Sequence, residues 1–174
     1  MIATLWIGAL AAALCCVLQD PAPEVEAAKA RLRTAMSATA IAFEQSESGL
    51  SLLARFDHDG DRKQTVCVAL APNQTNGLVC HNIYTTVWIG AAAAPDEALM
   101  RRVFAQAKKL GAFYMLNEGG TWAIRFGLQF DATDLPETLS ADHPRVKELR
   151  DLVRFVDAVG EETDAWLNGA NDMK

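Results

Sequence analysis

The sequence predicts an α+β domain in which helices cover a mostly antiparallel sheet of five strands. Three segments repeat apolar residues at intervals of three and four, the spacing of a helix with one buried side. The five segments predicted as strands are shorter, carry apolar runs or alternate apolar with polar residues, and are bounded by turn residues. The expected order is helix, three strands, helix, two strands, helix.

The first eighteen residues carry no charge and end abruptly at "QDPAPE". An apolar run at the N-terminus is typical of a signal peptide or a signal anchor, so we assign residues 1–20 to one of these. The protein is then expected to be exported, periplasmic or otherwise extracytoplasmic, or anchored, with membrane contact only through this segment. The alternative is a buried N-terminal helix in a cytoplasmic protein. The folded domain is expected to span residues 24–168.

The segment Glu24–Phe43 predicts the first helix, with Glu24 and Glu26 placed favourably near the positive end of the helix dipole. Its apolar side is expected to hold Val25, Ala28, Leu32, Met36, Thr39 and Phe43.

Three strands are expected next, at Gly49–Phe56, Gln64–Leu70 and Leu78–Ile89. The intervening "DHDGDR" and "PNQTNG" have the composition of turns. If the second and third strands pair, Cys67 and Cys80 come close enough to be a candidate disulfide. In a reducing compartment they would instead be ordinary small core residues.

A second helix is expected over Pro95–Leu110, where Pro95 suits the first turn and Gly111 ends the helix. A long third helix begins near Pro144 and ends near Gly169. Trp166 lies on the apolar side of that helix at helical spacing, which predicts a core position.

The most informative stretch is "YMLNEGGTWAIRFGLQF". A short strand at Ala112–Leu116 precedes the turn Asn117–Gly120, and a second strand follows over Thr121–Phe130. A phosphate-binding glycine loop would lead into a helix, and none is predicted here. In the second strand five apolar residues alternate with five others. The buried side is predicted to hold Trp122, Ile124, Phe126, Leu128 and Phe130, and the candidate binding face Ala123, Arg125, Gly127 and Gln129.

The order of elements over Glu24–Leu167 resembles that of type III secretion chaperones and of the related bacterial YbjN-like domains. The local similarity lies in the Leu116-Asn117 turn, the amphipathic strand Trp122–Phe130 and the Leu135-Pro136 step before the last helix. The resemblance implies protein binding. Such chaperones are small, acidic, usually dimeric proteins that hold an extended client, and YbjN-like domains are described as sensory or stress-related regulators. The chaperones are cytoplasmic, whereas the apolar N-terminus here predicts export.

The composition argues against several other functions. The chain has 16 basic and 22 acidic residues, a net charge of −6, which disfavours binding to nucleic acid. The "DHDGD" cluster at Asp57–Asp61 lacks the distal glutamate of a calcium loop. A Cys67–His81 nucleophile and base is conceivable, but no catalytic motif surrounds either residue.

The sequence therefore predicts a non-catalytic domain that binds a protein or peptide client. We expect no cofactor, no metal site and no catalytic residue, and a homodimer is a further hypothesis from the resemblance. One alternative is a cytoplasmic protein similar to the type III secretion chaperones. The other is an enzyme or small-ligand binder whose site is assembled from scattered residues.

Overall fold

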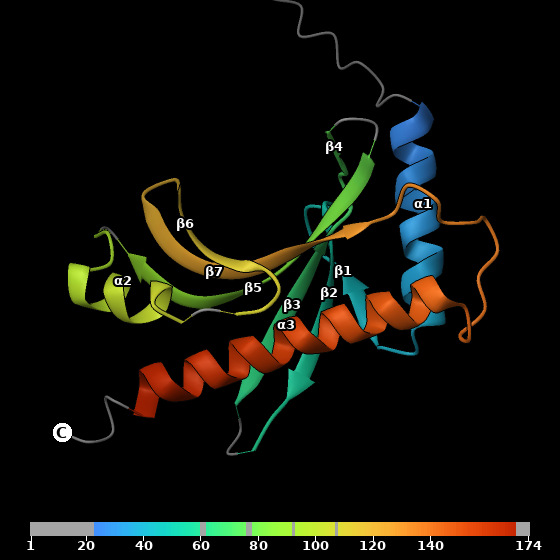
Figure 1. Cartoon of the computed structure of the whole chain (residues 1–174). Helices are drawn as coiled ribbons and strands as arrows, with labels where there is room; N and C mark the ends of the chain where they lie inside the picture. Colours follow the sequence, from blue (N-terminus) through green and yellow to red (C-terminus); the bar gives the residue numbers. More distant parts are fainter. Residues whose placement is uncertain (1–22, 60–61, 76–77, 92, 107, 170–174) are drawn as a thin grey trace, which may run out of the picture.

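The computed structural model describes residues 23–59, 62–75, 78–91, 93–106 and 108–169 (Figure 1). The predicted signal peptide or anchor at residues 1–20 lies outside this part of the chain. Within the described residues no helix is both long and apolar enough to cross a membrane. The elements are α1 (Pro23–Ala38), β1 (Phe43–Gln45), β2 (Ser51–Asp57), β3 (Lys63–Ala69), β4 (Asn73–Thr75), β5 (Leu78–Ala91), α2 (Glu97–Phe104), β6 (Ala112–Glu118), β7 (Thr121–Asp131) and α3 (Pro144–Gly169).

The predicted α+β class is confirmed, but the prediction of five strands is wrong. Six antiparallel strands follow the order β1-β2-β3-β5-β7-β6, and the short β4 pairs with β5 beside this path. The five predicted strands correspond to β2, β3, β5, β6 and β7. The two others, β1 and β4, have three residues each, too few for a periodic pattern to be visible in the sequence.

The first helix was predicted to continue to Phe43, which is the first residue of β1. The helix instead ends at Ala38, because Thr39 turns back and its hydroxyl donates to the carbonyl of Met36 at 2.7 Å. Ala40 then adopts a left-handed conformation with φ of 61°, which redirects the chain into β1. An alanine gives no sequence signal for such a stop.

Helix α2 is shorter than predicted. Asp96 caps its N-terminus by accepting a hydrogen bond from the amide of Leu99 at 2.7 Å, but the helix ends at Phe104 rather than Leu110. Leu110 was expected on the buried side and is 55 % exposed. A longer helix would have gained no burial there, and packing supplies most of the stability of a short helix.

The glycine turn between β6 and β7 is confirmed as a two-residue hairpin. Glu118 pairs with Thr121, and Gly119 and Gly120 have φ of 59° and 89°. Both angles are positive, which is the geometry that matches the twist of two paired strands. The Asn117 side chain accepts a hydrogen bond from the amide of Gly120 at 3.0 Å and stabilises the turn.

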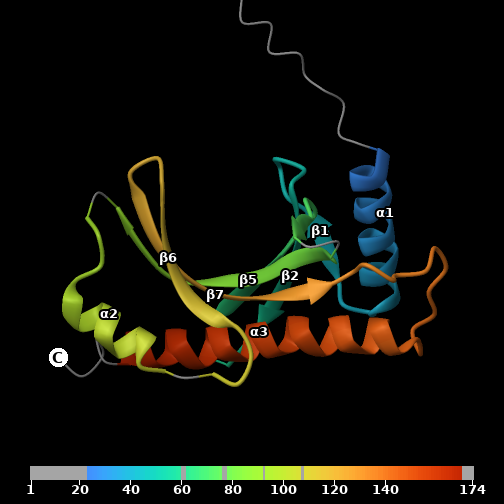
Figure 2. The same cartoon turned by 45° about the horizontal axis from the view of Figure 1, so that its top comes forward.

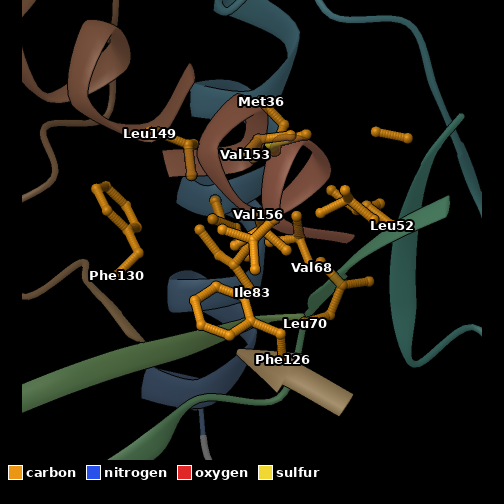
Figure 3. Packing of buried hydrophobic residues seen from close by; sticks show 14 of the residues in the cluster. Met36, Leu52, Val68, Leu70, Ile83, Phe126, Phe130, Leu149, Val153 and Val156 are labelled. Atoms are coloured by element: carbon orange, nitrogen blue, oxygen red, sulfur yellow. The ribbon is translucent and has the colours of Figure 1, made fainter. Parts of the chain in front are cut away.

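Helices α1 and α3 contact each other, and α3 packs against β3, β5 and β7 on one side of the sheet (Figure 2). The predicted alternation of β7 is confirmed: Ile124, Phe126 and Phe130 are fully buried, and Trp122 and Leu128 are partly buried. The core lies between α3 and the sheet and includes Met36, Leu52, Val68, Leu70, Ile83, Phe126, Phe130, Leu149, Val153 and Val156 (Figure 3).

Trp166 does not lie in this core, contrary to the sequence prediction. It belongs to the last turns of α3 and is 37 % exposed, with the guanidinium of Arg102 stacked 4.2 Å from the ring centroid. The helical spacing was right, but the spacing alone cannot show where a helix extends beyond the sheet.

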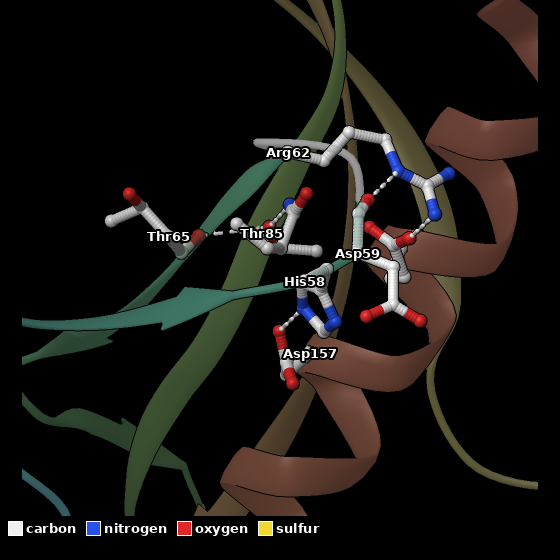
Figure 4. Close-up of polar contacts among 8 residues, drawn as sticks. His58, Asp59, Arg62, Thr65, Thr85 and Asp157 are labelled. Atoms are coloured by element: carbon white, nitrogen blue, oxygen red, sulfur yellow. Dashed lines mark hydrogen bonds and ion pairs between the residues drawn. The ribbon is translucent and has the colours of Figure 1, made fainter.

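Helix α3 approaches the sheet closely at Gly160. A β-carbon placed there would lie 2.8 Å from both the Gln64 side-chain nitrogen and the Thr85 methyl group. Gln64 donates to the hydroxyl of Thr85, which in turn donates to the carbonyl of Thr65 at 2.8 Å (Figure 4). Burying a polar group is costly unless it is hydrogen-bonded. These two bonds satisfy the Gln64 amide and the Thr85 hydroxyl beneath the helix.

Candidate binding site on the open face of the sheet

The side of the sheet opposite α3 carries none of the described helices, and we call it the open face (Figure 2). The predicted residues Ala123, Arg125, Gly127 and Gln129 all lie on it, because each alternates along β7 with a residue that points towards α3. Ala123 is buried, Arg125 and Gly127 are half-buried, and Gln129 is exposed. The available surface therefore begins at Arg125.

The open face is bent by an irregularity in β5. Thr86 pairs with Arg125 and Trp88 with Ile124, so Val87 is an extra residue without a partner on β7. Such a bulge increases the local bend of a strand pair. Figure 2 shows the β6–β7 hairpin curling away from α3, which makes the open face concave.

Gly127 forms the floor of a hollow of about 270 Å³ on this face. A β-carbon at this position would lie 3.0 Å from the Tyr114 ring and 3.1 Å from Tyr84. The absence of a side chain therefore lets the Tyr114 ring lie close against the strand. The hollow is lined by Asn82, Ile83, Tyr114, Gly127, Leu128 and Gln129.

Two amide side chains stand at the edge of the hollow. Asn82 and Gln129 are direct partners across β5 and β7, and the Asn82 carbonyl oxygen accepts from Gln129 at 3.4 Å. The same oxygen accepts from Asn73 on β4 at 3.2 Å. Both contacts use the side-chain oxygen of Asn82, so the amide N–H groups of Asn82 and the side-chain oxygen of Gln129 take no part in them. A donor and an acceptor side by side match the polar groups of a peptide bond.

Arg125 lies beside the hollow and is fixed by three neighbours. Its guanidinium stacks 4.7 Å from the Tyr84 ring centroid, and its Nε donates to Thr86 Oγ1 at 3.3 Å. Its two terminal nitrogens donate to the two carboxylate oxygens of Glu118 at 3.3 and 3.2 Å. The guanidinium is thus held flat against the sheet with one edge directed at a carboxylate.

Cys67 and Tyr84 are direct partners beneath Arg125. Burial raises the pKa of the Cys67 thiol, and the hydrogen bond from Tyr84 and the charge of Arg125 act in the opposite direction. Burial also raises the pKa of the phenols of Tyr84 and Tyr114. These three groups are therefore uncharged at neutral pH, so Arg125 and Glu118 carry the charge of this cluster.

The candidate disulfide is not formed, and Cys67 and Cys80 are both free. They share the open face as expected, but Cys67 lies opposite Tyr84, four positions along β5 from Cys80. Four positions of a strand span about 13 Å, whereas the α-carbons of a disulfide lie within about 7 Å.

The considered pairing of Cys67 with His81 is excluded by the same register. His81 is fully buried and points to the α3 side of β5, whereas Cys67 points to the open face. His81 Nδ1 donates to the carbonyl of Ala69 at 2.9 Å, and its Nε2 has no hydrogen-bond partner among the described residues. The two side chains therefore cannot exchange a proton directly.

Burial lowers the pKa of His81 below its ordinary value of 6.5, and the bond to Ala69 only partly offsets this effect. The unfolded chain then binds a proton at higher pH than the folded chain. We expect the free energy of unfolding to fall as the pH drops below about 6.5, by up to about 1.4 kcal/mol per pH unit, until the lowered pKa is reached. Urea unfolding at several pH values measures this slope.

The variant His81→Gln keeps a donor for Ala69 but cannot titrate, so the slope attributed to His81 should disappear. The matched variant His143→Gln should keep the slope, because His81 is still present. An unchanged slope in His81→Gln would contradict the assignment.

The acidic cluster at Asp57–Asp61 serves as a structural contact where the structure describes it (Figure 4). His58 is bonded to Asp157 of α3 at 2.9 Å, and Arg62 forms an ion pair with Glu161 of α3 at 2.5 Å. The β2–β3 hairpin is thereby tied to the helix. Among the described residues no three His, Cys, Asp or Glu side chains are grouped so that they could hold a metal ion.

Sequence reasoning placed the β7 residues of the site but missed Asn82, Tyr84, Tyr114 and Glu118. Asn82, Tyr84 and Tyr114 belong to strands that were predicted, and period-two alternation gives their faces once one residue of each strand is placed. Glu118 was predicted in the turn Asn117–Gly120, but it is the last residue of β6. What the sequence did not provide is the pairing that brings β5 and β6 to either side of β7. No protein-family model matches the chain, and a search of curated proteins found no significant match.

Proposed function

We propose that this protein is a non-catalytic domain that binds an extended peptide or protein segment on the open face. The observation that carries the proposal is the hollow at Gly127, which lies on the sheet face opposite α3, beside paired amides and a fixed arginine. Ligand sites in proteins are concave and combine apolar walls with a few placed polar groups. The hollow is about the size of one large side chain.

The chemistry of the lining suits a peptide. The Tyr114 ring and the bare backbone at Gly127 offer an apolar wall and floor for a side chain. Asn82 and Gln129 offer the donor and acceptor that a peptide group needs. Burial raises the pKa of Cys67, Tyr84 and Tyr114, so none of these three side chains is an activated nucleophile at neutral pH.

The proposal includes the relationship suggested by the sequence. A YbjN-like or secretion-chaperone-like domain, exported through residues 1–20, would present this face to a client outside the cytoplasm. Fractionation with N-terminal sequencing of the mature protein tests the export, and a cytoplasmic, uncleaved chain would favour the chaperone-like alternative. The homodimer is part of the same proposal, and a monomer mass independent of concentration in light scattering would contradict it.

Selection of a random peptide library on the folded protein tests the proposed function. Selected peptides should shift the backbone amide resonances around Gly127, Gln129 and Asn82 in nuclear magnetic resonance spectra. The variant Gln129→Trp places a large ring at the hollow and should weaken these peptides at least tenfold, or about 1.4 kcal/mol.

The matched variant Asp151→Trp adds the same ring on α3, where Asp151 is 74 % exposed and remote from the open face. It should leave peptide binding unchanged. Peptides that bind the wild type and Gln129→Trp equally, or that shift only residues of α2 and α3, would contradict the proposed site.

A further inference from the structure

Arg125 is held in place by the protein's own sheet. Its side chain is 19 % exposed, its guanidinium stacks on Tyr84, and Nε is bonded to Thr86. Stacking on an aromatic ring and a bond to Nε together fix the plane of a guanidinium. The terminal nitrogens remain as a flat, two-pronged donor edge, the shape that recognises a carboxylate.

Glu118 occupies that edge loosely. Its two distances to Arg125, 3.2 and 3.3 Å, are longer than the roughly 2.8 Å typical of a charge-assisted hydrogen bond. Glu118 is 66 % exposed and closes the hairpin next to Gly119. Because the Glu118 carboxylate is exposed and its contacts are long, a second carboxylate can take its place at Arg125 at little cost.

The hollow at Gly127 lies at a defined distance from this edge. Arg125 and Gly127 are alternate residues of β7 on the same face, so their α-carbons are separated by about 6.8 Å. Alternate side chains of an extended peptide have the same spacing. One side chain of such a peptide can enter the hollow against Tyr114 while the next but one reaches Arg125.

We propose that Glu118 holds the position of a ligand carboxylate, and that the open face selects an extended peptide with an acidic side chain two positions from an apolar one. The apolar side chain fills the hollow at Gly127, and the acidic one displaces Glu118 from Arg125. Asn82 and Gln129, which lie beyond Gly127 on the side away from Arg125, bind the peptide group on the other side of the apolar residue. This inference rests on the proposed function and names its ligand class.

Three end-blocked peptides and one small ion test it by nuclear magnetic resonance titration. The peptides are Gly-Leu-Gly-Glu-Gly, its Glu→Gln form and its Leu→Gly form, and sodium acetate supplies the bare carboxylate. On the wild type, the first peptide should bind about tenfold more tightly than either changed form, which is the range for one charged hydrogen-bonding contact or one buried side chain. Acetate should not reproduce its shifts.

The protein variants form a cycle with these peptides. In Arg125→Gln the advantage of Glu over Gln in the peptide should vanish. In Glu118→Gln, which changes an exposed residue and should fold normally, the acidic peptide should bind about threefold more tightly, because its competitor is gone. Glu162→Gln is the matched control: Glu162 is 67 % exposed and paired with Lys108, far from the open face, and its loss should not change binding.

Equal binding of the Glu and Gln peptides, no gain in Glu118→Gln, or equivalent shifts from acetate would each overturn this inference. Failure of all the defined peptides would overturn it as well. The library selection decides the proposed function independently, since peptides without an acidic residue that still bind at Gly127 would uphold the face and reject only the ligand class.

Discussion

Replacement of Phe126 by alanine is expected to lower the free energy of unfolding by about 4 kcal/mol. Phe126 is fully buried at the centre of the core, with Phe113 at 5.1 Å and Phe155 of α3 at 6.0 Å between ring centroids. The loss combines the transfer of a large apolar side chain with a cavity that the surrounding core residues cannot easily close. Equilibrium denaturation with urea measures it.

The matched change is Gln129→Ala, on the same strand but on the open face. It should change stability by less than about 0.5 kcal/mol, as exposed substitutions usually do. If both variants had similar stability, the assignment of the two faces of β7 would be wrong, and with it the location of the proposed site.

Replacement of Gly160 by alanine is expected to destabilise the protein by about 2 kcal/mol. In an ordinary helix interior the same change stabilises by about 1 kcal/mol, because alanine is the better helix former. Here the new β-carbon would lie 2.8 Å from Gln64 and from Thr85. Both neighbours are buried and joined by a hydrogen bond, so neither can move without breaking it. A loss of stability in Gly160→Ala, rather than a gain, therefore indicates that α3 lies close to the sheet at this position.

Thr85→Ser should restore part of the stability lost in Gly160→Ala. It removes the methyl group in the way but keeps the hydroxyl that bonds Thr65 and Gln64. Asp151→Ala, at an exposed position of the same helix, should be almost neutral. A Gly160→Ala variant more stable than the wild type would show that α3 does not approach the sheet as closely as described.

The elements that the sequence predicted best are those whose pattern repeats many times. Strand β7 alternates over its whole length, and α3 is long with a regular apolar side. The glycine turn was predictable because two consecutive glycines between two strand patterns are typical of a turn that needs positive φ angles, as Gly119 and Gly120 have.

The failures have local causes. After α1 ends at Ala38, Ala40 redirects the chain with a left-handed backbone conformation that an alanine does not predict. Strand β4 depends on its pairing with β5 rather than on its own composition. Trp166 shows a different limit, since its helical register was right and its environment was not. Strand length and pairing are decided by contacts between distant residues, which a single sequence does not display.

The candidate site also has a part that one strand predicts and a part that depends on strand pairing. Arg125, Gly127 and Gln129 follow from one strand and could be proposed from sequence. Tyr84 and Tyr114 complete the site only because β5 and β6 lie on either side of β7. The disulfide hypothesis failed for this reason too, since pairing register rather than proximity in sequence separates the two cysteines.

Helix α3, which covers β3, β5 and β7, is the last described element to be synthesised. A nascent chain stopped before Pro144 contains the described strands β1–β7, but the apolar side of the sheet, including Phe126 and Phe130, remains exposed to solvent. The core between the sheet and α3 therefore cannot form until α3 has been synthesised.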